Sequence, residues 1–143
     1  MKFILILFLN IWLFACSGES KKSEMISFES IMIKYFDSYD PVFESSIKRP
    51  ENNTGTILID KKKLSKLEMN KIKDKIKSDG WKEMESSESY SLYCLSNYQL
   101  IGILYPNDLI ERNNKGEEIT YEDVNYWNIG LYYNKSGVNS CKR

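Results

Sequence analysis

The side chains best suited to chemistry gather in a polar connection at residues 107–125. Six carboxylates lie there, with one arginine and one tyrosine among them. Connections of this length are often functional or lack fixed structure. Three interpretations stay open: a plain solvated loop, a recognition loop for a protein partner, or carboxylates for Ca²⁺ or glycoside chemistry. The spacing does not follow the EF-hand pattern, and a glycosidase needs two carboxyls about 5–10 Å apart across a cleft.

The chain contains no histidine. Ser-His-Asp and Cys-His nucleophile arrangements are therefore excluded, and so are the common zinc sites that depend on histidine or several thiolates. No phosphate loop, dinucleotide fingerprint or internal repeat is present in the sequence. We therefore expect no metal, cofactor or nucleotide, and we expect the protein not to be an enzyme. The remaining enzymatic alternative is a small hydrolase that uses the carboxylates of Glu117, Glu118, Glu122 and Asp123.

Tyrosine is the second feature that could serve binding, with 10 residues in the chain. Most of them fall on predicted strands, and a sheet with one covered face points about half of its side chains outward. Tyrosine favours interfaces because its ring offers a large contact area with a polar tip. The competing interpretation is that these rings pack across strands and stabilise the sheet. The candidate partner-binding residues are Tyr121, Glu122, Asp123, Tyr126 and Tyr132.

An export signal occupies the N-terminus. Lys2 is followed by an apolar run, and the tetrapeptide Leu13-Phe14-Ala15-Cys16 then places a cysteine directly after a small residue. The run is shorter than the roughly 20 residues that a membrane-spanning helix needs, and it fits the apolar part of a signal peptide. The tetrapeptide resembles the lipobox of bacterial lipoproteins. The resemblance implies that residues 1–15 are removed and that Cys16 is lipidated and becomes the first residue of the mature protein.

A cysteine of that kind would carry two or three acyl chains, and two are enough for stable membrane anchoring. Residues 16–24 would then be the lipidated end and a short linker, whose residues 17–24 reach about 25–30 Å at most. A single domain at residues 25–143 follows. By the same resemblance, Ser17 after the cysteine implies outer-membrane sorting. We expect a lipid-anchored envelope protein that faces the periplasm, with exposure at the cell surface as the alternative.

Two cysteines remain once Cys16 is assigned to lipid. In an oxidising compartment we expect Cys94 and Cys141 to form a disulfide. In the chain-entropy model this bond would constrain the unfolded chain by roughly 4 kcal/mol. The alternative is two free thiols or one reactive nucleophile. The disulfide interpretation removes cysteine from the candidate catalytic groups.

Charge is balanced, with 20 Lys and Arg against 20 Asp and Glu. Removal of Lys2 with the signal leaves one excess negative charge on the mature chain. No strong field of either sign results, so we expect no nucleic-acid partner.

The best-specified element is a helix at residues 66–78. Ser65 and Glu68 form a capping box, Ile72 and Ile76 continue an apolar stripe, and Gly80 suits the C-terminal cap. We also expect a helix at 23–39 capped by Ser23, a loop at 49–55, and strands at 42–47, 56–60, 81–85, 89–95, 98–105, 126–133 and 138–142. These elements predict an α+β two-layer domain, with an antiparallel sheet of about 4–6 strands and one or two helices on one face.

The leading hypothesis is a non-enzymatic protein-binding module held at the membrane by its lipid. In its most concrete form it is an inhibitor or immunity lipoprotein that neutralises an enzyme of the envelope. It would meet its partner through the tyrosine-rich sheet face or the 107–125 connection. The alternative is an accessory lipoprotein of envelope assembly that binds peptidoglycan or another lipoprotein.

Overall fold

A computed structural model describes residues 25–113 and 116–142 of the chain. The predicted anchor at Cys16 and the cap expected at Ser23 lie outside the described residues. The elements follow one another as α1 (Phe28–Phe36), a 3-10 turn (Asp37–Tyr39), β1 (Val42–Lys48), β2 (Asn52–Asp60), α2 (Lys66–Ser78), β3 (Lys82–Ser86), β4 (Tyr90–Leu95), β5 (Gln99–Leu104), β6 (Ile110–Arg112), β7 (Glu118–Thr120), β8 (Tyr126–Asn134) and a second 3-10 turn (Asn139–Cys141).

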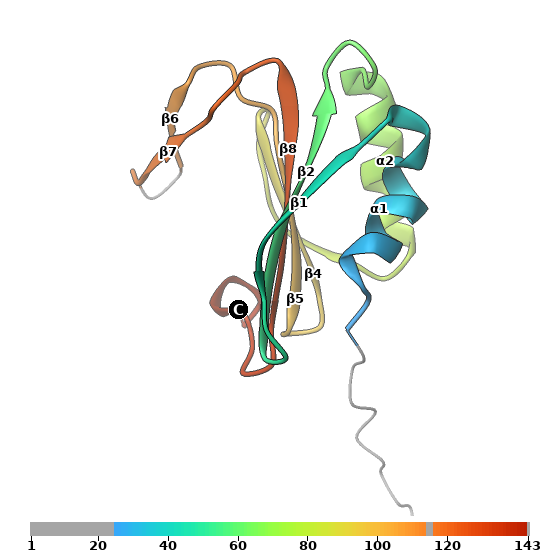
Figure 1. The fold of residues 1–143 in the computed structure, drawn as a ribbon, viewed down its shortest axis with the longest axis vertical. Helices are drawn as coiled ribbons and strands as arrows, with labels where there is room; N and C mark the ends of the chain where they lie inside the picture. The colour runs from blue at the N-terminus through green and yellow to red at the C-terminus, as the bar shows by residue number, and fades with distance from the viewer. Residues whose placement is uncertain (1–24, 114–115, 143) are drawn as a thin grey trace, which may run out of the picture.

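The main sheet has six antiparallel strands in the order β1-β2-β8-β5-β4-β3. The last strand of the chain, β8, is inserted between β2 and β5. It thereby joins the hairpin β1–β2 to the meander β3–β4–β5. Both helices cover one face of this sheet (Figure 1), and we call the other side the open face. The predicted α+β two-layer fold is confirmed.

Both helices begin at serine caps. Ser27 Oγ accepts the N–H of Ser30 at 3.0 Å, and Ser65 Oγ accepts the N–H of Glu68 at 3.2 Å. The carboxylate of Glu68 returns to the N–H of Ser65, which completes the capping box predicted for α2. The bonds to Ser65 also lower the pKa of Glu68. Among the described residues, neither helix is long and apolar enough to cross a membrane.

Helix α1 is shorter than the helix expected at 23–39, because its cap is Ser27 and its last turn tightens into the 3-10 turn. Asp40 then takes a left-handed conformation with φ 49°. Pro41 follows and cannot supply the N–H that a continuing helix requires. The chain therefore reverses direction here and enters β1.

The core lies between the helices and the covered face of the sheet. Strand β8 shows the alternation that builds it, since Trp127, Ile129 and Leu131 are buried against the helices. The indole N–H of Trp127 donates to the carbonyl of Leu64 at 2.8 Å, so this buried polar group is paired. The other members of the core include Ile31, Phe36, Ile57, Ile59, Met69, Ile76, Tyr93, Ile101 and Ile103.

Two segments contradict the predicted loop and edge strand. Residues 49–55 were expected to be a loop, but β2 begins at Asn52 because its polar start pairs with β8, from Asn134 to Tyr132. Such pairing overrides the weak strand preference of asparagine. Residues 138–142 were expected to form an edge strand, but the chain there forms the second 3-10 turn.

The two edges of the sheet carry irregularities. The register shifts between Ser45 and Ile47 in β1, and between Glu83 and Glu85 in β3. Bulges of this kind twist an edge and discourage the addition of another strand. The open face of the sheet is therefore better suited to a partner than its edges.

A disulfide joins Cys94 of β4 to Cys141 of the C-terminal segment, with the two Cα atoms 5.7 Å apart. The segment folds back over one end of the open face. There Val138 and Cys141 are buried, and Leu100 and Tyr132 pack against them. The predicted pairing of these cysteines is confirmed.

We expect the double substitution Cys94→Ser/Cys141→Ser to lower the free energy of unfolding by about 2–4 kcal/mol, because the bond closes a long loop in the unfolded chain. Denaturant unfolding without reductant measures this difference. The unsubstituted protein with excess reductant serves as the control and should match the double variant. Equal unfolding midpoints for the oxidised protein and the double variant would contradict the expectation.

Candidate functional site

Two projections frame the open face. One is the C-terminal segment; the other is the 107–125 connection, which we call the arm. The arm contains β6 and β7 and stands on the side of the sheet away from the helices, at the opposite end from the C-terminal segment (Figure 1). The region between them is the part of the open face left for a partner.

In its described residues, 107–113 and 116–125, the arm contains two paired strands and is not an irregular loop. β6 and β7 form a second, two-stranded antiparallel sheet. The carboxylate of Glu111 accepts the N–H groups of Asn107 and Asp108, at 2.6 and 3.3 Å. The guanidinium of Arg112 donates to the carbonyl of Gly116 at 3.0 Å and lies 3.7 Å from the carboxylate of Glu118. Several of the charged side chains predicted for chemistry thus hold the arm itself together.

Tyr121 closes the base of the arm. Its N–H donates to the carbonyl of Leu109 at 2.8 Å, and its side chain is only 8% exposed. Burial, helped by the nearby Glu111 carboxylate, raises the pKa of Tyr121 to about 12. The hydroxyl therefore stays neutral near pH 7, and the buried residue lines the groove described next.

A groove of about 420 Å³ lies where the arm meets the open face. The sheet supplies its floor and the chain between β7 and β8 supplies its wall. The groove is lined by Val42, Glu44, Thr56, Leu58, Thr120, Tyr121, Glu122, Asp123, Tyr126 and Asn128. Four of the five predicted partner-binding residues, Tyr121, Glu122, Asp123 and Tyr126, are therefore brought together in one place.

The fifth predicted residue, Tyr132, lies elsewhere. It shares the open face with Tyr126, but it is half-buried and packs against Val138 and the disulfide. The carboxylates proposed for a hydrolase are also divided. Glu122 and Asp123 line the groove, whereas Glu117 accepts a bond from Asn113 on the arm and Glu118 pairs with Arg112.

A shallow lane adjoins the groove at Gly130 and ends at Gly102, which is buried and where a Cβ atom would lie 3.8–3.9 Å from the side chains of Leu92, Leu100 and Leu104. Gly130 of β8 stands directly opposite Gly102 of β5 and, on its other side, opposite Thr56 of β2. A Cβ atom placed on Gly130 would meet only the carbonyl oxygen of Gly102, at 4.0 Å. Leu58 and Tyr132 belong to the neighbouring rows of the same face. An extended chain could lie in this lane with its backbone close to the sheet.

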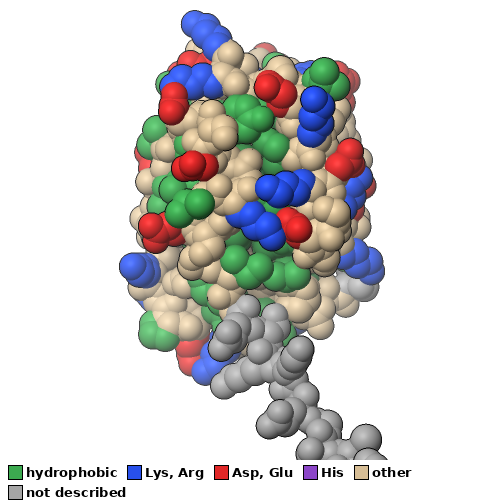
Figure 2. Space-filling view, turned by 90° about the vertical axis from the view of Figure 1, so that its right-hand side faces the viewer, with side chains coloured by type: hydrophobic (Ala, Val, Ile, Leu, Met, Phe, Trp, Pro, Cys, Tyr) green, Lys and Arg blue, Asp and Glu red, His purple; other side chains and the backbone are tan. Residues whose placement is uncertain are grey.

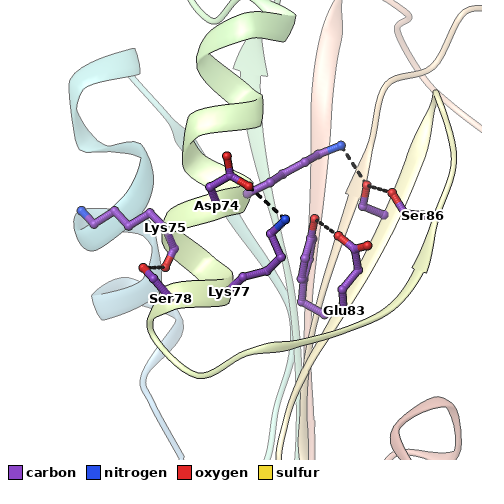
Figure 3. A network of polar contacts seen from close by, with 9 residues as sticks. Asp74, Lys75, Lys77, Ser78, Glu83 and Ser86 are labelled. Atoms are coloured by element: carbon purple, nitrogen blue, oxygen red, sulfur yellow. Dashed lines mark hydrogen bonds and ion pairs between the residues drawn. The ribbon is translucent and has the colours of Figure 1, made fainter.

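A second hollow, about 460 Å³ in volume, lies between α2 and the β3–β4 hairpin. Lys73 is half-buried there and donates to Ser91 at 2.8 Å, and burial lowers the pKa of Lys73. The hydroxyl of Tyr93 donates to Glu83 at 3.0 Å. Figure 3 shows this network with the ion pair of Asp74 and Lys77.

Sequence reasoning missed this cleft, because the lysines of α2 have the spacing of a solvated face. A lysine bonded to a serine is one arrangement of base and nucleophile available without histidine. Ser91, however, is 0% exposed, so its hydroxyl satisfies Lys73 and cannot reach a substrate. The cleft is best understood as a structural polar network.

The helix layer offers no patch of one sign. Figure 2 shows acidic and basic side chains interspersed over it, and pairs such as Lys34 and Asp79, 3.0 Å apart, neutralise one another. In residues 25–113 and 116–142, no group of three or more Asp, Glu, Cys or His side chains lies close enough to hold a metal ion. The groove and its lane therefore remain the best candidate site.

No protein-family model, curated protein or solved structure matches the chain. The function must therefore be inferred from the geometry of the domain itself.

Two glycines provide a test of the lane within the fold. Gly55 lies on the covered face, where a Cβ atom would come within 2.7 Å of the Phe43 ring, so Gly55→Ala should lower the free energy of unfolding by about 1–3 kcal/mol. Gly130→Ala meets no such obstacle. It should raise the free energy of unfolding by about 0.5–1 kcal/mol, because alanine loses less chain entropy on folding than glycine does. Denaturant unfolding of the two variants checks both signs. Destabilisation by Gly130→Ala would show that the lane is not open.

Proposed function

We propose that the protein is a lipid-anchored binding module of the bacterial cell envelope, which recognises a protein partner through the groove and lane of its open face. The observation that carries the proposal is the convergence of Tyr121, Glu122, Asp123 and Tyr126 on one groove. An inhibitor or immunity role toward an envelope enzyme is the concrete form that we favour. Anchoring at Cys16 rests on the lipobox resemblance.

The chemistry of the groove supports binding rather than catalysis. Its floor is partly apolar, its walls carry two tyrosines, and polar groups lie at the rim, which is the usual composition of a protein interface. A hydrolase would instead require its carboxylates to face one another across a cleft. All four candidate carboxylates belong to the arm, but only Glu122 and Asp123 line the groove, so the binding function is the better supported of the two.

The position of the N-terminal end also favours an accessible groove. The side-chain amide of Gln99 both accepts the N–H of Ile26, at 3.1 Å, and donates to its carbonyl, at 2.6 Å. Gln99 pairs with Tyr133 near the end of β8, whereas Tyr126 in the groove begins that strand. The seven residue steps from Tyr126 to Tyr133 span about 23 Å. The chain thus leads toward the proposed anchor from the end of the domain opposite the groove.

Photo-crosslinking tests the partner. A benzoyl-phenylalanine placed at Tyr126 in the full chain, in the native cells, should give one discrete adduct with an envelope protein. The same residue at Lys71, an exposed position on α2, is the matched control and should give none. Gly130→Val fills the lane and should reduce the Tyr126 adduct at least about tenfold, which corresponds to about 1.4 kcal/mol. Equal adducts from both positions, or full persistence in the Gly130→Val background, would refute the proposed surface.

The anchor has a separate test. Cys16→Ser should move the protein from the membrane fraction to the soluble envelope fraction, because a lipidated cysteine supplies the stable attachment. It should also abolish the incorporation of an alkyne-labelled fatty acid. Ser17→Ala is the control and should leave both readouts unchanged. Continued labelling of the Cys16→Ser protein would contradict lipidation at this position.

A further inference from the structure

We propose that the groove takes a lysine or arginine side chain carried by an extended segment of the partner. This inference rests on the proposed function and specifies the chemistry of its partner. The groove has three carboxylates, Glu44, Glu122 and Asp123, and its lining includes no lysine or arginine. In a chain with equal numbers of acidic and basic residues, this local excess attracts a cation.

Two of the three groove carboxylates, Glu44 and Glu122, are not paired with a cation in the described residues, whereas Asp123 is attracted by Lys61 and its Oδ1 accepts the N–H of Asn125. Over the described residues, none of the three forms a salt bridge. Two lysines near this end of the sheet have other partners. Lys61 donates to the carbonyl of Pro106 and lies 3.7 Å from the centre of the Tyr105 ring, and Lys63 pairs with Asp40 at 2.9 Å. A cation supplied by a partner would therefore meet Glu44 and Glu122 first, with Asp123 beside them.

The remaining lining suits an organic cation better than a metal ion. Ca²⁺ takes six to eight oxygen ligands, whereas this groove presents the rings of Tyr121 and Tyr126 and the aliphatic side chains of Val42 and Leu58. A lysine or arginine can lay its aliphatic stem along apolar surface while its charged end reaches polar groups. Tyrosine faces add cation–π attraction. Only a side chain with both an aliphatic stem and a positive charge can contact the aliphatic side chains, the tyrosine rings and the carboxylates of the groove together.

The lane explains why the cation should come on an extended segment. Gly130 leaves a position in the middle of the open face without a side chain, and this lane meets the groove at Thr56 and Glu44 of the same row. In an extended chain, alternate side chains point to one side. A segment lying in the lane can therefore direct one basic side chain into the groove.

The experiment compares blocked peptides that differ in one side chain. The probes are Ac-Val-X-Val-NH2 with X as lysine, arginine, norleucine or glutamate, added to the full chain in detergent solution and followed by the amide NMR signals of Gly102, Gly130 and Asn128. We expect the lysine and arginine peptides to shift these signals with at least fivefold higher affinity than norleucine. Higher salt should weaken the effect because it screens exposed charges.

Two triple variants distinguish the effect of the groove carboxylates from the effect of the net charge of the protein. Glu44→Gln/Glu122→Gln/Asp123→Asn should remove the preference for basic peptides. Glu29→Gln/Glu117→Gln/Asp37→Asn removes the same charge outside the groove and should retain it. If norleucine or glutamate binds as well as lysine, or if both triple variants behave alike, the cation proposal is overturned while groove binding stands. If no peptide shifts these signals, the cation proposal also fails, and the Tyr126 crosslink decides the proposed function independently.

Discussion

Strand β8 is the element on which the rest of the domain depends. It pairs over nine positions with β2 and over six with β5, and it is the only neighbour that the β1–β2 hairpin and the β3–β5 meander share in the main sheet. Its alternation sends Trp127, Ile129 and Leu131 into the core. A slip of one residue would exchange its two faces. Burial of the core therefore also determines which side chains of β8 the open face presents.

The open face has a glycine, Gly130, at a position where the stability of the fold does not require one. Glycine weakens a strand interior because it loses more chain entropy on folding. Gly55 has a reason to be glycine, since the Phe43 ring lies against it. Gly130 has room for a side chain and still has none. Departures from local preference are expected where function imposes them, and this one lies beside the groove. The bulged edges of the sheet leave this face as the accessible surface.

Much of the fold could be predicted from local patterns. The capping box set the start of α2, alternation set the faces of β4 and β8, and cysteine parity set the Cys94–Cys141 bond. The strand order could not be predicted, because periodicity does not say that β8 enters between β2 and β5. The residues of the groove wall are close together in the sequence, so they could be named in advance. Val42, Thr56 and Leu58 of the floor come from β1 and β2, and they could not be named without the strand order. The covering of Tyr132 depends on the path of the C-terminal segment, which no periodicity encodes.

The orientation of the domain restricts the partners that the proposed groove can reach. With the proposed anchor at Cys16, the chain enters the domain near Gln99, about 23 Å along β8 from Tyr126. The eight residues of the proposed linker reach about 25–30 Å at most, so the proposed anchor would hold the domain near the membrane. The groove nevertheless lies at the end away from the point of attachment. A segment of a soluble or opposing protein could reach it directly, whereas a protein buried in the same membrane would have to extend past the whole length of the sheet. The geometry therefore favours a partner that approaches from the aqueous side.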